Sequence, residues 1–263
     1  LTREDLRTVT IGMEVCVDSV TSAQNAALGG AARLELCSSL SAGGLTPTFG
    51  LLKKIKQLVQ IPVFCMVRPR SGDFLYSKDE IDLMCDDIQL LISGGSNGFV
   101  FGCLDSHGNV DRASCSRLVE ACEGQPMTFH RAFDMTNDAF EAAKCVIKLG
   151  FSRVLTSGQQ STALKGSDLI TELVREFDDR LIIVAGGGIS EHNIAELLKL
   201  TNVREFHGSA RAKLDSKMIF RNERSSMGKI SSDDYSVEVA STAKVSRIVD
   251  VWRSHVKQKE RMK

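Results

Sequence analysis

The sequence predicts an α/β fold, a single (β/α)8 barrel of the TIM type with an irregular insertion before its last helix. Three observations support this prediction. Eight short apolar runs recur at roughly even spacing along the 263 residues, and amphipathic helical patterns lie between them. Alternation of this kind favours a parallel sheet with crossover helices, and eight units in a chain of this length favour closure. No Gly-x-Gly-x-x-Gly pattern follows the first run, which argues against a dinucleotide-binding fold.

The apolar runs are the predicted strands, and the amphipathic patterns between them are the predicted helices. In chain order the strands are expected at 12–17, 33–37, 62–68, 98–102, 126–130, 152–157, 181–186 and 204–208. Helices are expected at 50–59, 78–92, 164–177, 191–200 and 243–257, with Ser190 as the N-cap of the fourth. Glycines at the ends of several helical patterns are typical of helices that stop just before a strand.

One stretch breaks the alternation. Residues 209–240 are rich in Ser, Lys, Arg and Asp. We interpret them as an irregular insertion in the last connection of a single domain that covers residues 1–263. Long connections of this kind are usually functional, interfacial or partly disordered.

Composition narrows the class of protein. Hydrophobic residues make up 43% and charged residues 25%, and 33 basic residues balance 33 acidic ones, so no nucleic-acid partner is expected. No apolar run approaches the about 20 residues that span a bilayer, so no membrane partner is expected either. The first residues lack the apolar core of a signal peptide. Eight cysteines lie in apolar stretches without a Cys-x-x-Cys pair, which favours reduced thiols and a cytoplasmic location.

A short pattern, Glu-x-Cys, occurs in the first two predicted strands, as Glu14 with Cys16 and as Glu35 with Cys37. Residues i and i+2 of a strand face the same way, so each acid shares a face with its thiol. The residues around them are apolar and take the opposite face. We therefore expect the acids and thiols to line the interior of the barrel.

Cys16 and Cys37 are the candidate metal ligands. Neighbouring strands lie about 4.8 Å apart, close enough for two thiolates to hold one soft ion such as Cu(I). Inward residues of adjacent barrel strands occupy different layers, so an offset between the two thiols stays open. Zinc is disfavoured because four ligands at a standard spacing are absent from the sequence. The other cysteines are expected to pack as small hydrophobes, namely Cys65, Cys85, Cys103, Cys115, Cys122 and Cys145.

Polar residues also follow the predicted strands, where barrel proteins gather their functional groups. The candidate anion-binding residues are Arg68, Arg70, Arg131, Gly187 and Ser209, and the candidate proton-transfer residues are Glu14, Glu35 and His130. One interpretation is an ion-pair network in which the three arginines are the counter-charges of the two glutamates. The other is a site where the arginines bind an anion while a carboxylate or the histidine moves protons.

The glycine run 186–188 ends the seventh predicted strand. Barrel enzymes often bind phosphate with the loops after strands seven and eight, and Ser209 follows the eighth strand here. Three glycines serve a tight turn equally well, so both interpretations stay open.

These stretches together resemble the CutC copper-homeostasis family. The motifs that carry the resemblance are Met-Glu-Val-Cys-Val-Asp-Ser (13–19), Arg-Leu-Glu-Leu-Cys-Ser (33–38), Gly-Gly-Leu-Thr-Pro-Thr (43–48), Val-Arg-Pro-Arg-Ser-Gly-Asp-Phe-Leu-Tyr-Ser (67–77), Thr-Phe-His-Arg-Ala-Phe-Asp (128–134), Arg-Val-Leu-Thr-Ser-Gly (153–158), Gly-Gly-Gly-Ile (186–189) and Glu-Phe-His-Gly-Ser-Ala (205–210). They cover nearly the whole chain in the family's order, and only the segment beyond 240 is uninformative.

The resemblance implies one barrel with an atypical final segment, a cytoplasmic location that in animal members extends to the nucleus, and a homo-oligomer (a dimer or tetramer). It also implies Cu(I) binding through Cys16 and Cys37. Animal relatives often carry Phe-His-Cys-Ser near the last strand, whereas this chain has Gly208 in place of that cysteine. A copper role for a thiol at that position is therefore excluded.

Two functions remain open from the sequence. One is a copper homeostasis protein that binds Cu(I) through the strand-end cysteines. The other is a TIM-barrel enzyme acting on a small anionic, for example phosphorylated, metabolite, because a metal carrier has no evident need for the arginines, His130 and the glycine run.

Overall fold

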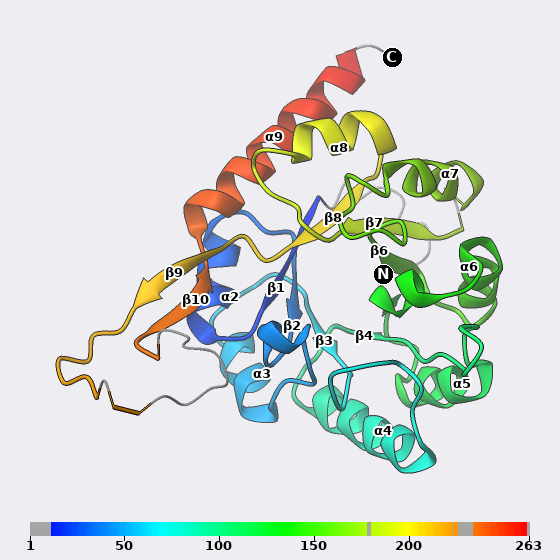
Figure 1. Cartoon of the computed structure of the whole chain (residues 1–263), viewed down its shortest axis with the longest axis horizontal. Helices are drawn as coiled ribbons and strands as arrows, with labels where there is room; N and C mark the ends of the chain where they lie inside the picture. Colours follow the sequence, from blue (N-terminus) through cyan, green and yellow to red (C-terminus); the bar gives the residue numbers. More distant parts are fainter. Residues whose placement is uncertain (1–11, 178–179, 223, 226–233, 262–263) are drawn as a thin grey trace.

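The computed structural model describes residues 12–177, 180–222, 224–225 and 234–261. Eight parallel strands close into a barrel in the order of the chain, and helices surround it (Figure 1). The strands are β1 (Met13–Val17), β2 (Arg33–Leu36), β3 (Val63–Met66), β4 (Gly98–Phe101), β5 (Met127–Phe129), β6 (Arg153–Thr156), β7 (Ile182–Gly186) and β8 (Glu205–Gly208). Each lies within one of the predicted ranges, so the predicted (β/α)8 fold is confirmed.

The helices follow the strands on the outside of the barrel. They are α2 (Val20–Leu28), α3 (Phe49–Lys56), α4 (Lys78–Ser93), α5 (Arg112–Ala121), α6 (Ala139–Lys148), α7 (Ser167–Phe177), α8 (Ile194–Thr201) and α9 (Thr242–Arg261), with 3-10 turns η1 (Leu40–Ala42) and η2 (Arg131–Met135) after β2 and β5. Side chains fix several helix starts: in α4, Ser77 and Glu80 form a capping box. None of the described helices is long and apolar enough to cross a membrane.

Two predictions about the last third of the chain need correction. The segment 209–240 is not irregular throughout: β9 (Arg211–Asp215) and β10 (Ser236–Ala240) pair antiparallel and extend away from the barrel as a ribbon (Figure 1). Residues 223 and 226–233 of this segment lie outside the described residues. Ser190 is not the N-cap of α8. That helix begins later, after Asn193, whose side chain instead accepts a hydrogen bond from the Ser190 N–H.

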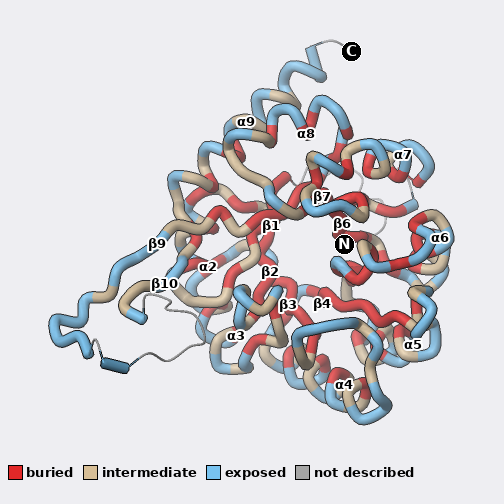
Figure 2. The backbone as a smooth tube through the Cα atoms, in the orientation of Figure 1, coloured by how far each residue is buried: buried red, intermediate tan, exposed pale blue. Residues whose placement is uncertain are grey.

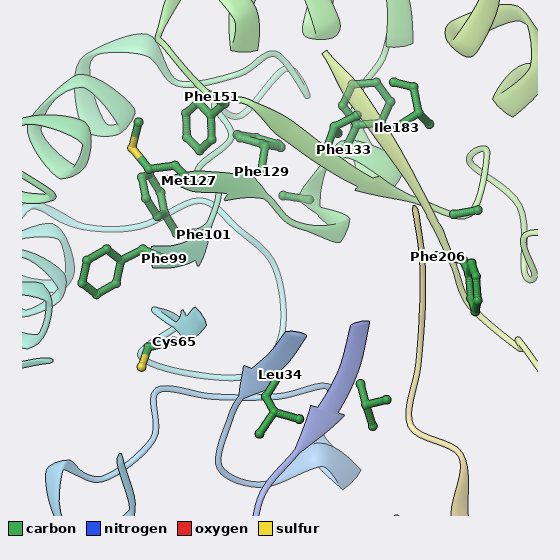
Figure 3. Close-up of a cluster of buried hydrophobic side chains, with 14 of the residues drawn as sticks. Leu34, Cys65, Phe99, Phe101, Met127, Phe129, Phe133, Phe151, Ile183 and Phe206 are labelled. Atoms are coloured by element: carbon green, nitrogen blue, oxygen red, sulfur yellow. The ribbon is translucent and has the colours of Figure 1, made fainter. Parts of the chain in front are cut away.

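Alternation along the strands separates two environments. Val15 and Leu36 belong to the apolar layer between strands and helices, as predicted, and both are fully buried. Burial follows the strands, while the outer faces of the helices are exposed (Figure 2). Part of this layer is an aromatic cluster (Figure 3). In it the ring centroids of Phe129 and Phe151 lie 5.4 Å apart, and the two rings pack edge to face. The six cysteines that were expected to behave as small hydrophobes all pack in this layer.

Buried charges fill the barrel near the N-terminal ends of its strands. Arg33 donates to Glu14 at 2.5 Å and to Glu205 at 2.7 Å, and Arg153 donates to Glu205 at 3.2 Å. Both guanidinium groups lie over the ring of Phe64, with Cζ 4.9 Å and 5.7 Å from its centroid. All four charged side chains are buried, so each depends on its partners to replace lost hydration.

The counter-charges expected for Glu14 were therefore wrong. Arg33 occupies that position, because it is two residues before Glu35 in β2 and faces the same way. Arg68, Arg70 and Arg131 all lie beyond the ends of β3 and β5, outside this layer of charges.

A glycine makes room for the aromatic ring under these arginines. Gly98 is the neighbour of Phe64 in the sheet, and a Cβ atom there would lie 2.7 Å from the Phe64 ring and 2.6 Å from the carbonyl oxygen of Pro126. We expect Gly98→Ala to lower the free energy of unfolding by about 1–3 kcal/mol through overpacking. Urea denaturation measures this change.

Gly50→Ala is the matched control. Gly50 lies in α3, and an added Cβ would meet nothing within 4 Å. The same substitution should there raise the free energy of unfolding by about 0.5–1 kcal/mol, because alanine is the better helix former. Equal effects at the two positions would contradict the packing argument.

Candidate metal and ligand site

A cavity opens at the carboxyl ends of the strands. Its volume is about 290 Å3, and seven of the ten predicted site residues line it: Cys16, Glu35, Arg68, His130, Arg131, Gly187 and Ser209. Glu14, Cys37 and Arg70 are not among the residues that line it. Closure of the barrel thus brings together side chains from both ends of the sequence.

Three donor groups in this cavity lie close enough to share one metal ion. The Sγ of Cys16, a carboxylate oxygen of Glu35 and a ring nitrogen of His207 all lie within 4.8 Å of one another. They come from three adjacent strands, β1, β2 and β8, and Cys16 is the direct neighbour of Glu35 in the sheet. Nε2 of His207 lies 3.8 Å from Oε2 of Glu35.

The imidazole of His207 is held by a second acid. Its Nδ1 lies 2.8 Å from Oε1 of Glu14, and this carboxylate also accepts from Arg33. Burial alone would raise the pKa of Glu14, but the charges of Arg33 and His207 hold that pKa well below its ordinary value. Glu14 is therefore ionised and keeps the Nδ1 proton of His207 in place, which leaves Nε2 to face the cavity.

The protonation of His207 is governed by its neighbours. Burial alone would lower its pKa, but the charges of Cys16 and Glu35 and the hydrogen bond to Glu14 outweigh burial and raise the pKa well above its ordinary value. At neutral pH the ring is therefore protonated on both nitrogens and carries a positive charge. A metal ion that binds at Nε2 would have to displace the proton there.

Glu35 differs from Glu14 although the two occupy equivalent sequence motifs. Its Oε2 accepts a weak hydrogen bond from Sγ of Cys37 at 3.4 Å, while its Oε1 is buried and has no partner among the described residues. Burial raises its pKa, an effect that the charge of His207 offsets only in part. Glu35 is thus the acid of the mouth that readily accepts a proton.

The two predicted metal ligands are not equivalent. Cys16 is half-buried and lines the cavity, whereas Cys37 is fully buried among Phe64, Met66 and Val100. Burial, followed by the charge of Glu35, raises the pKa of Cys37 well above its ordinary value. Its thiol is therefore protonated at neutral pH.

The three candidate arginines have separate environments. Arg68 lines the cavity and donates to the carbonyl groups of three loop residues, Ala42, Gly44 and Gly72. Arg131 also lines it, held by Asp134 at 2.7 Å and Ser157 at 2.8 Å. Arg70 instead pairs with Glu80 and Asp73 outside the cavity.

His130 has one nitrogen occupied and one free. Its Nδ1 accepts from the N–H of Ala132 at 3.2 Å, so the neutral ring carries its proton on Nε2. That Nε2 is buried without a partner among the described residues. Burial, and then the positive charge of Arg68, lower the pKa of His130 to about 3. The ring is a neutral hydrogen-bond donor rather than a base at neutral pH.

Sequence reasoning placed His207 at the end of the eighth strand but gave it no role as a ligand, and it did not find Arg33 as the partner of Glu14. Each had a signal in its strand: Arg33 shares the facing of Glu35, and His207 is two residues after Glu205. The strand pattern does not show that the barrel closes by pairing β8 with β1, and this closure places His207 beside Glu14.

The fold and the site together define a closed (β/α)8 barrel protein whose mouth carries a thiol, a carboxylate and an imidazole arranged as a candidate metal site. The model of the CutC family matches residues 11–212, and this chain belongs to the CutC family. It is 50% identical over 234 residues to the copper homeostasis protein cutC homolog of Homo sapiens. The aligned region covers 89% of this chain and 86% of the human protein.

Other relatives agree with this assignment. The family protein CutC of Porphyromonas gingivalis is 43% identical over 240 residues, covering 91% of this chain and 97% of that protein. Among solved structures, the CutC protein of Streptococcus agalactiae matches with a TM-score of 0.73 at 31% identity, over 76% of this chain and 98% of that one.

The two acids of the Glu-x-Cys motifs should respond in opposite ways to loss of charge. We expect Glu35→Gln to raise the free energy of unfolding at neutral pH by about 1 kcal/mol, because it removes a buried carboxylate with an unpartnered oxygen. The folded-state pKa of Glu35 is raised, so in the parent the protonated Glu35 contributes its full stability below the pKa of the unfolded state. This contribution is lost as pH rises through the folded-state pKa. The stability gained by Glu35→Gln should therefore vanish at acidic pH.

Glu14→Gln is the matched control, since it is the same substitution in the neighbouring strand. It should lower the free energy of unfolding by about 3–5 kcal/mol, because Arg33 and His207 lose the charge that they share. Denaturant titrations of both variants at several pH values measure these changes. Stabilisation by both variants, or by neither, would contradict the different roles assigned to the two acids.

Proposed function

We propose that this protein binds Cu(I) at the barrel mouth, with Cys16 and Cys37 as thiolate ligands and His207 as an imidazole ligand. The observation that carries the proposal is the approach of the Cys16 thiol, the Glu35 carboxylate and the His207 ring to within 4.8 Å of one another. Thiolate and imidazole are ligands that soft Cu(I) accepts well. The names of the human and mouse relatives as copper homeostasis proteins support the choice of metal.

The surroundings of His207 support its role as a ligand. A metal-bound histidine usually donates its other ring N–H to a carboxylate, which fixes the tautomer and the ring orientation. Glu14 supplies that carboxylate at 2.8 Å, and Arg33 on its other side keeps it ionised.

Cys37 would join the site by losing its proton. Its thiol donates to Oε2 of Glu35, so this carboxylate is the nearest acceptor for the proton that a bound cation would displace. Cys16 lines the cavity, so a metal ion reaches its sulfur without entering the apolar cluster around Cys37. We therefore assign Cys16 the larger share of the affinity and Cys37 the smaller.

The first test replaces the thiols. Cys16→Ser with Cys37→Ser should abolish Cu(I) binding in competition with a Cu(I) chelator, and Cys16→Ser alone should weaken it by about 100-fold or more, because a soft thiolate ligand is lost. The control is Cys85→Ser with Cys122→Ser, at two cysteines that pack in the helix layer. Equal binding by both double variants would mean that the strand thiols are structural.

The second test uses pH. Because the raised pKa of His207 keeps the ring protonated at neutral pH, Cu(I) must displace a proton to reach Nε2. Affinity should therefore fall as pH is lowered, by up to about tenfold per pH unit for each proton displaced. His207→Asn should weaken binding and flatten this dependence relative to the parent. An unchanged slope in that variant would remove His207 from the ligand set.

A second candidate function, an enzyme acting on a small anionic metabolite, is favoured by one observation. Glu35 combines a raised pKa with a free oxygen beside an open cavity, which suits a group that transfers a proton to or from a bound molecule. The other two proton-transfer candidates are less suited: Glu14 is held ionised between Arg33 and His207, and His130 stays neutral.

A further inference from the structure

One wall of the cavity carries a positive charge that pairs with no carboxylate in the described part of the chain. Arg68 is 7% exposed, and its guanidinium donates to the carbonyl oxygens of Ala42, Gly44 and Gly72. No carboxylate of the described residues pairs with it. The neutral hydroxyl of Tyr76 lies close enough to feel the charge but supplies none of its own. Buried guanidinium groups normally have an anionic partner, and the described residues supply none for Arg68.

A second donor faces the same cavity. Nε2–H of His130 is buried and has no acceptor among the described residues, and the residue is 3% exposed. The ring of Phe74 links this donor to Arg68, because it lies 4.8 Å from the His130 ring and 5.1 Å from the Arg68 Cζ. A group that accepts a hydrogen bond and carries negative charge would satisfy both residues.

Glu35, which also lines the cavity, adds an acceptor. Its Oε1 is buried without a donor in the described part of the chain. The Cu(I) proposal uses neither Arg68 nor His130, and it gives this oxygen no donor. Nε of the positively charged Arg68, Nε2 of His130 and Oε1 of Glu35 all lack a partner among the described residues, and the three residues line a cavity of about 290 Å3. This set is complementary to a small anion that also carries a hydroxyl group.

We propose that the barrel mouth binds a small hydroxyl-bearing organic oxyanion, with its carboxylate or phosphate group on Arg68 and His130 and its hydroxyl on Glu35. This proposal deepens the second candidate function by naming its ligand class, and it does not depend on copper.

The opposite rim offers a competing location for the anion. Arg131 lines the cavity, but Asp134 already neutralises it. Gly187 and Gly188 have φ of +104° and +75°, and the hydrogen bonds among the described residues use their carbonyls rather than their N–H groups. Because the charge of Arg68 is the one without a partner, we assign the oxyanion to the Arg68 side, and variants distinguish the two locations.

The test is isothermal titration calorimetry of the copper-free protein with inorganic phosphate, acetate and glycolate at constant ionic strength. At least one of the first two should bind, and the one preferred identifies the oxyanion class. Glycolate should bind about threefold to tenfold more tightly than acetate, because only glycolate offers a hydroxyl to Glu35. Absence of binding by all three would overturn the proposal, and equal affinity for acetate and glycolate would overturn the role of Glu35.

Variants of His130 give the sharpest comparison, because Arg68 also ties three loops together and its loss endangers folding. In His130→Asn the side-chain oxygen can still accept from the N–H of Ala132, but the donor at Nε2 is lost, so anion affinity should fall about tenfold. In His130→Gln a longer amide can restore a donor at that place, and affinity should partly recover. Equal affinity in the parent and both variants would overturn the assignment.

Two arginine variants complete the test. Arg70→Met is the control, because Arg70 pairs with Glu80 and Asp73 outside the cavity and its loss should leave anion binding unchanged. Arg131→Met should also leave it nearly unchanged. If only Arg131→Met abolishes binding, the anion lies on the glycine rim and the assignment to Arg68 is wrong. Parallel Cu(I) titrations keep the outcome separate, since either result leaves the copper proposal standing on its own measurements.

Discussion

The carboxylate of Glu14 links the two halves of the barrel interior. It accepts from Arg33, which belongs to the buried charges near the N-terminal ends of the strands, and from His207, which faces the mouth. If either contact were missing, Arg33 or His207 would lose a carboxylate partner in the buried interior. Because both are made, the charges that stabilise the barrel also orient the imidazole of the candidate site. Structure and chemistry therefore share one residue.

The interior changes character along the strand direction. Near the strand starts, Arg33, Arg153 and their acids form a neutralised layer over Phe64. At the strand ends, groups with unpartnered atoms surround an open cavity. Polar groups in a protein interior are normally paired, so the unpaired atoms of Glu35, Arg68 and His130 in the described part of this cavity support the proposed ligand. The same contrast explains why Glu14 and Glu35, in equivalent motifs, have pKa values shifted in opposite directions.

Residues of one type near the mouth are not interchangeable. Arg70 is neutralised on the loop surface and Arg131 is neutralised by Asp134. Arg68 donates to backbone carbonyls and pairs with no carboxylate among the described residues. Cys16 lines the cavity, while Cys37 is buried in an apolar cluster and donates a hydrogen bond to Glu35. Neighbours that come from other strands make these differences, and they decide which residue remains available for a ligand.

The sequence by itself determined the barrel and the inward facing of the two Glu-x-Cys motifs. Both follow from local periodicity: apolar residues at every second strand position must face the helices, which leaves the acids and thiols inside. The partners of those acids depended on tertiary structure, because Glu14 meets Arg33 across adjacent strands and meets His207, 193 positions away in sequence, only when β8 pairs with β1. Charge pairing inside a closed barrel depends on distances in space that no strand pattern contains, and so the site's protonation states could be assigned only from the fold.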